Sequence, residues 1–161
     1  MKKTFHICLI ATNEDLKKNI YRKLFDLYFM DFGQLDTLGS YKADTPVNLN
    51  GENYKFSIFT QTNQFNLSNG LLKAIKNADS SYIAFELSDQ KSWNNVKSII
   101  QRINQEVIGH RFVLAGNISK DQDKKVNQQE IDDLVGQYKV NYHEICVDTG
   151  ENVKTSFEKF I

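Results

Sequence analysis

Cysteine is scarce in this sequence, and its scarcity excludes two classes of protein. The two cysteines, Cys8 and Cys146, lie in apolar runs far apart along the chain. Two thiols without a CxxC pair or neighbouring histidines predict neither a disulfide framework nor a structural metal site. We therefore expect two reduced cysteines in the core of a cytosolic protein.

Long hydrophobic runs are also missing. No apolar stretch approaches the roughly 18 residues that cross a bilayer. The basic N-terminus leads into only five apolar residues, 7–11, too few for the core of a signal peptide. The last four residues, 158–161, contain no cysteine for prenylation. These features predict a soluble, cytoplasmic protein without a direct membrane anchor.

The chain has no excess of charge of either sign. Lys plus Arg and Asp plus Glu both number 20, so the net charge is zero. That balance gives no electrostatic reason to expect nucleic acid or an anionic membrane as the main partner. A length of 161 residues with 40% hydrophobic residues suits one globular domain spanning residues 1–161.

What the sequence does contain is a regular alternation of short apolar runs and longer amphipathic stretches, which is typical of repeated β-α units. The apolar and alternating runs predict six strands, over residues 5–11, 41–49, 54–59, 82–87, 111–115 and 142–147. The amphipathic stretches predict five helices, over residues 15–30, 67–76, 92–104, 130–138 and 152–161.

The second and third predicted strands form a hairpin, because Asn50-Gly51 is a strong turn signal between them. Pro46 lies inside the first arm of this hairpin and predicts an edge strand, since proline cannot donate to a sheet ladder. We therefore expect an α/β fold of three layers (α/β/α), with a six-stranded, mostly parallel sheet and one antiparallel edge strand.

The most informative stretch covers residues 78–97 and reads Ala-Asp-Ser-Ser-Tyr-Ile-Ala-Phe-Glu-Leu-Ser-Asp-Gln-Lys-Ser-Trp-Asn-Asn-Val-Lys. It resembles the fourth strand and third helix of the Ras superfamily of small GTPases, most closely Rab proteins. Residues 114–117 (Leu-Ala-Gly-Asn) and 149–153 (Thr-Gly-Glu-Asn-Val) add further matches. The resemblance covers almost the whole chain and implies the fold of P-loop NTPases of the Ras and Rab type.

The resemblance also indicates where nucleotide chemistry would lie. Residues 37–64 align without gaps to a Rab switch region, so Thr37 stands at the position of a magnesium ligand and Gln64 at that of the residue that orients water. Thr37 has lost its partners in metal binding, and Gln64 is alternatively an ordinary surface residue with no water to orient. After the first strand, Lys17 matches the family's phosphate-binding lysine and Lys18 replaces its magnesium-binding Ser/Thr. A register shifted by one residue would make Lys18 and Asn19 the relevant pair. Otherwise the two lysines are an exposed pair on the first turn of a helix.

Other positions of the family motifs have changed. The two glycines of the phosphate loop are Ala11 and Leu16, and Glu14 and Asp15 place carboxylates where phosphate charge would lie. The motif Asp-x-x-Gly reads Thr-Gln-Thr-Asn at residues 60–63.

The guanine-binding motifs have changed as well. Asn-Lys-x-Asp reads Asn-Ile-Ser-Lys at residues 117–120, and Ser-Ala-Lys reads Cys-Val-Asp at residues 146–148. Lys120 presents only donors to guanine's donors. Asn117 remains, either as a base ligand or as a brace between loops.

The histidines suggest no catalytic centre. His6, His110 and His143 stand at no motif spacing from a serine or cysteine, so no triad is predicted. We expect each to be a surface residue or one with its hydrogen bonds satisfied.

Together these observations predict a catalytically inactive Rab-like pseudo-GTPase that acts as a protein-binding or scaffold module. No cofactor is expected, and the partner is another protein bound through a switch-like surface. The candidate contacts are Leu38, Tyr41, Phe59, Phe65 and Leu67; four of them, all but Leu38, are alternatively core or hairpin packing. One rival hypothesis is an atypical GTPase that binds GTP or GDP without normal magnesium chemistry and hydrolyses GTP poorly. Another is that the chain is part of a larger protein.

Overall fold

The computed structural model describes residues 3–28, 40–61 and 69–159 of the chain. The strands are β1 (Lys3–Ala11), β2 (Ser40–Leu49), β3 (Glu52–Gln61), β4 (Ser80–Glu86), β5 (Phe112–Asn117) and β6 (Val140–Ile145). The helices are α1 (Glu14–Tyr28), α2 (Asn69–Asn77), α3 (Gln90–Glu106), α4 (Gln128–Gln137) and α5 (Val153–Glu158). The described residues therefore confirm the expected six strands and five helices.

One sheet contains the strands in the order β2-β3-β1-β4-β5-β6. Only β2 runs antiparallel to its neighbour; the other pairs are parallel. Pro46 lies in β2 at the sheet edge, as predicted. Asn50 and Gly51 form the hairpin turn with positive φ angles of 52° and 82°, the conformation that an Asn-Gly turn adopts readily.

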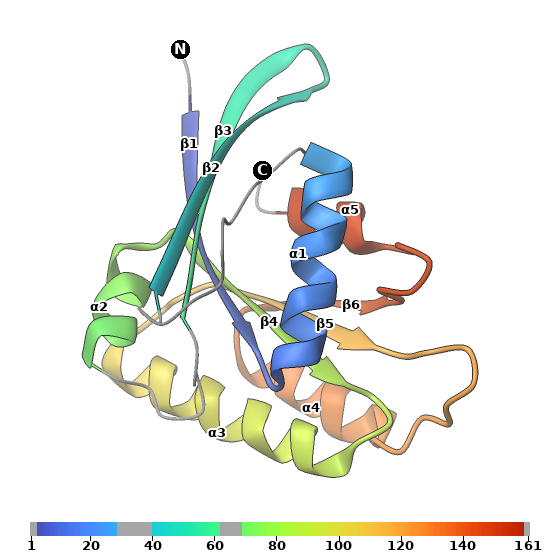
Figure 1. Ribbon diagram of the computed structural model, residues 1–161. Coiled ribbons are helices and arrows are strands. Elements are labelled where there is room, and N and C mark those ends of the chain that lie inside the picture. Colours follow the sequence, from blue (N-terminus) through green and yellow to red (C-terminus); the bar gives the residue numbers. More distant parts are fainter. Residues whose placement is uncertain (1–2, 29–39, 62–68, 160–161) are drawn as a thin grey trace.

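Helices cover both faces of the sheet, so the expected three-layer arrangement is confirmed (Figure 1). Helices α1 and α5 pack on one face, where their apolar side chains join those of β1, β3 and β4 in a single buried cluster. Helices α2, α3 and α4 bury a second cluster on the other face. Both cysteines are buried and free, as expected, and burial raises the pKa of the Cys8 thiol to about 12.

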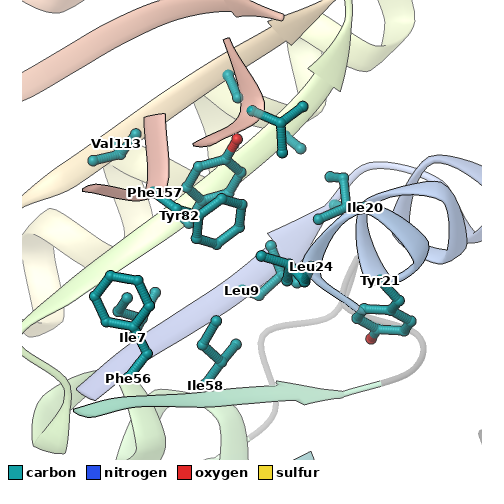
Figure 2. Close-up of a cluster of buried hydrophobic side chains, with 14 of the residues drawn as sticks. Ile7, Leu9, Ile20, Tyr21, Leu24, Phe56, Ile58, Tyr82, Val113 and Phe157 are labelled. Carbon is teal, nitrogen blue, oxygen red and sulfur yellow. The ribbon is translucent and has the colours of Figure 1, made fainter. Parts of the chain in front are cut away.

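The α1 and α5 face is held together by large side chains from elements distant in sequence (Figure 2). Tyr82 of β4 stacks on Phe157 of α5 with ring centroids 4.0 Å apart. Its hydroxyl lies 2.7 Å from the Ser156 hydroxyl, which itself donates to the Val153 carbonyl. Because a serine hydroxyl has one proton, the Tyr82 hydroxyl is the donor to Ser156. This contact fixes the short helix α5 to the centre of the sheet.

Parallel strands place their carboxyl ends at one edge of the sheet, where open α/β folds bind ligands. In this chain, that edge brings together the connection after β1, the end of β4 and the loops after β5 and β6. The residues singled out in the sequence therefore meet there.

Candidate functional site

The connection between β1 and α1 is only two residues long, Thr12 and Asn13. The Thr12 amide continues the ladder by donating to the Ala84 carbonyl at 3.0 Å, and its hydroxyl lies 2.6 Å from that of Ser92. Asn13 caps helix α1, because its side-chain oxygen accepts the Leu16 amide proton at 2.7 Å. The backbone here passes directly from strand to capped helix.

Lys17 is buried rather than exposed, so the alternative of an exposed lysine pair is wrong for this residue. Its side chain is 2% exposed, and its ammonium donates to Glu14 Oε1 at 3.0 Å. Burial lowers the pKa of Lys17, while the hydrogen bond and the charge of Glu14 oppose that shift. Lys18 and Asp15 are exposed on the same turn.

The burial of Lys17, which was expected to be exposed, has a physical reason. Lys17 lies three residues before Ile20, which is fully buried on the inner face of α1. Sequence reasoning placed the charge in solvent, but a lysine can bury its alkyl stem when a carboxylate meets its ammonium. Glu14, one turn earlier, supplies that carboxylate.

At the end of β3, Thr60 occupies the first position of the Thr-Gln-Thr-Asn segment. It is fully buried, and its hydroxyl donates to the Leu9 carbonyl at 3.0 Å. The Thr60 hydroxyl oxygen in turn accepts the proton of the Tyr21 hydroxyl at 3.2 Å. Thr60 therefore ties β3 to β1 and α1.

Asn117 braces the loops around it, as one of the two sequence alternatives predicted. Its amide nitrogen donates to Glu86 Oε2 at 3.0 Å, and its oxygen accepts the Val147 amide proton at 3.0 Å. The residue is 3% exposed. Asn117 thus joins the ends of β4 and β5 to the loop after β6.

Glu86 was missed by the sequence analysis. Burial raises the pKa of its carboxyl group, hydrogen bonds from Asn117 and Asn13 lower it, and the charges of Asp148 and Asp89 raise it. The available signal was a carboxylate that ends a buried apolar strand at the carboxyl edge of the sheet. Glu86 therefore links Asn13, in the connection between β1 and α1, to Asn117, at the position of the guanine-binding motif.

A cavity of about 440 Å³ lies beside this cluster. It is lined by Thr12, Asn13, Asp89, Lys91, Ser92 and Asn95. It therefore opens between the first connection and the start of α3. Lys120 is exposed in the loop after β5 and does not line it.

The predicted switch and partner residues are only partly covered. Thr37, Leu38, Gln64, Phe65 and Leu67 lie outside the described residues.

Of the remaining partner candidates, Tyr41 lies in β2, but its side chain is outside the described part. Phe59 is half-buried and packs against the cluster beneath α2 and α3. It also lines a small cavity of about 170 Å³ with Ala74 and Ala78. Its packing agrees with the core alternative while leaving part of the ring exposed.

Within the described ranges, no three His, Cys, Asp or Glu side chains form a group suited to a metal ion. Across the same ranges, no helix combines the length and apolar character that crossing a membrane requires.

His110 has its hydrogen bond satisfied, as expected for one of the three histidines. Its Nε2 lies 2.8 Å from the Ser81 hydroxyl, and Ser81 is fully buried. This serine–histidine pair has no access for a substrate. Burial lowers the pKa of His110, and it also lowers that of His143.

These shifts predict lower stability in mild acid. A folded-state pKa below the unfolded value means that the unfolded chain binds the proton more readily, so stability is lost as pH falls through about 6.5. We expect the urea midpoint of the wild type to fall between pH 7.5 and 5.5, and to fall less in His110→Gln. His6→Gln, at an exposed histidine, is the matched control. Equal pH slopes for His110→Gln and wild type would refute the assignment.

The sheet order, the single antiparallel edge strand and the helices on both faces define a P-loop GTPase fold of the Ras type. The family model described as Ras family matches residues 17–161. The chain therefore belongs to the Ras family. No curated protein matches it significantly.

Proposed function

We propose that this chain is a catalytically inactive, Rab-like member of the family that acts as a protein-binding or scaffold module in the cytoplasm. It holds guanine nucleotide very weakly or not at all. The observation that carries the proposal is Lys17, whose ammonium is buried and paired with Glu14 on a helix that begins two residues after β1.

Phosphate binding needs a loop whose backbone N–H groups point at the ligand. In this chain the Leu16 amide donates to the Asn13 side chain and the Lys17 amide to the Asn13 carbonyl. A triphosphate would have to remove this cap, which stabilises a helix by about 1 kcal/mol, and separate Lys17 from Glu14. It would also approach the Glu14 carboxylate, a like charge. The observed arrangement therefore opposes phosphate binding.

The residues at the base and metal positions do not fit guanine or Mg²⁺ either. Lys120 offers an ammonium where an acceptor is needed, and Lys18 offers one where a hydroxyl would bind the metal. Asn117 has its amide group engaged by Glu86 and Val147. Loss of a required polar match can cost as much as about 10⁴–10⁵ in discrimination.

The chain keeps the fold of the family, but its residues at the phosphate, base and metal positions do not suit a nucleotide. This combination supports a role in protein binding. Residues 78–97 and 37–64 resemble Rab proteins, and this resemblance implies a partner surface around the switch segments. Its proposed contacts are Leu38, Tyr41, Phe59, Phe65 and Leu67. Phe59, half-buried on β3, is the one of these contacts whose side chain the structure describes.

Titration calorimetry tests the proposal. We expect no binding of GTP, GDP or ATP in the micromolar range, with or without Mg²⁺, and no guanine nucleotide released when the purified protein is denatured. A small GTPase with intact motifs is the positive control. Micromolar binding of GTP or GDP without Mg²⁺ would instead support the rival atypical GTPase.

The variant Glu14→Gln makes this test sharper. It removes the carboxylate charge 3.0 Å from the Lys17 ammonium without changing the length of the connection. We expect it to bind no nucleotide, because the short connection and Lys120 remain. If Glu14→Gln gains GTP affinity, the ion pair alone blocks an otherwise competent site.

A further inference from the structure

A hollow lies at the amino ends of the strands, at the opposite edge of the sheet from the motif loops. Strand β1 begins at Lys3, whereas the first residue of β4, Ser80, pairs with Ile7. Residues 3–6 therefore project beyond the start of β4, together with the β2-β3 hairpin (Figure 1). The space beside this projection is a cavity of about 470 Å³.

Basic residues dominate the charge around this cavity. Lys3 at the start of β1, Arg111 just before β5 and Lys159 just after α5 all line it. Asp79 is the acidic residue of the lining, and its Oδ2 already accepts the His6 amide proton at 2.8 Å. Among the lining residues that the structure describes, three cations and one carboxylate leave a formal charge of +2.

Apolar residues line the cavity as well, beside the polar Thr4, Ser80 and Asn141. Ile7, Phe112 and Val113 line it, and each is 1% exposed. Phe5, which is partly buried, lines it as well. A lining that combines basic and apolar residues suits a ligand with an anionic head and an apolar body.

We propose that this cavity binds a small phosphate monoester with an apolar body. A phosphate monoester carries about −1.5 to −2 charges at pH 7, which matches the +2 of the described lining. A guanidinium such as that of Arg111 pairs with phosphate oxygens through two hydrogen bonds. The volume lies within the roughly 300–1,000 Å³ of small-molecule sites, which favours a free metabolite over a macromolecule.

This inference does not depend on the proposed function. The cavity lies at the amino ends of the strands, and the motif loops lie at their carboxyl ends. The result of the nucleotide titration therefore does not decide whether this cavity binds its ligand, and the experiment below does not decide the proposed function.

Calorimetry with octyl phosphate, used below its micelle concentration, tests the inference. We expect octyl phosphate to bind at least tenfold more tightly than inorganic phosphate, which lacks the apolar body, and than octanol, which lacks the charge. Phenyl phosphate in a parallel titration distinguishes aromatic from alkyl ligands. Vesicles containing phosphatidic acid test a membrane source, and retention on vesicles without binding of soluble octyl phosphate would contradict the proposal.

Two variants locate the binding. Arg111→Gln and Lys159→Gln should each weaken octyl phosphate binding at least fivefold. The Arg111 carbonyl accepts bonds from Ser80 and Ser81, so its backbone stays fixed when the side chain changes. Lys73→Gln, at an exposed site on α2, is the matched control and should bind as the wild type does.

Unfolding curves recorded for each variant show whether it is folded. If Arg111→Gln does not fold, Lys159→Gln, which lies beyond the last helix, tests the proposal by itself. Equal affinity for octyl phosphate and inorganic phosphate would overturn the proposal. So would unchanged binding in both folded variants.

Discussion

Replacing Asn117 with alanine is expected to lower the free energy of unfolding of the nucleotide-free protein by about 2–4 kcal/mol. The substitution removes the hydrogen bonds to Glu86 and to the Val147 amide, both 3.0 Å long. Val147 is buried, so its amide would lose its acceptor without water to replace it. Urea unfolding with nucleotide absent measures the effect.

The variant Asn117→Asp separates the two bonds. It keeps an acceptor for Val147 but places a second carboxylate against Glu86, a repulsion on the order of 1–4 kcal/mol at this distance. We expect Asn117→Asp to be destabilised at pH 7 and to regain stability relative to the wild type as pH falls, because protonation of either carboxyl removes the repulsion.

Asn94→Ala provides the matched control, since Asn94 is exposed on α3 and makes one exposed hydrogen bond. It should change stability by no more than about 0.5 kcal/mol. If Asn117→Ala leaves the nucleotide-free protein equally stable, Asn117 is not a structural brace. A role confined to the guanine base would then account for it better.

Replacing Tyr82 with alanine should cost about 3–5 kcal/mol, the largest effect that we expect for a single core substitution. Tyr82 is fully buried and stacks on Phe157 at 4.0 Å, so its loss leaves a cavity between β4 and α5 (Figure 2). Because α5 is short, it depends on this contact for its position. The urea midpoint should fall with little change in the slope.

Tyr82→Phe keeps the ring and removes only the hydrogen bond to Ser156, at an expected cost of about 1 kcal/mol. Phe25→Ala removes an aromatic ring that is 51% exposed on α1 and should have a far smaller effect than Tyr82→Ala. A loss of similar size in Phe25→Ala and Tyr82→Ala would show that the stacked pair is not what anchors α5.

The fold was predictable because its signals are local. Alternating apolar runs located each strand, Pro46 marked the edge strand, and Asn50-Gly51 marked the hairpin turn. Strand ends moved by a few residues: β6 begins at Val140 rather than at residue 142. Pairing with β5, which continues to Val140, sets that boundary, and periodicity within one segment does not reveal it.

The site was only partly predictable. The sequence located Lys17 and Asn117, but the burial of Lys17 depends on how α1 lies against the sheet and on Glu14 one turn earlier. Glu86 went unnoticed because its partners, Asn13 and Asn117, come from other loops. Hydrogen bonds between residues 31 apart, such as that of Asn117 with Glu86, leave no periodic trace in the chain.

The sequence by itself determined the order of strands and helices, the edge hairpin and the family, because backbone preferences and apolar periodicity act over a few neighbouring residues. Only the tertiary structure decided that Lys17 is buried against Glu14, that Asn117 joins three segments, and that Lys3, Arg111 and Lys159 line one cavity. Those properties depend on burial and on charges that only the packing of the sheet and helices brings together.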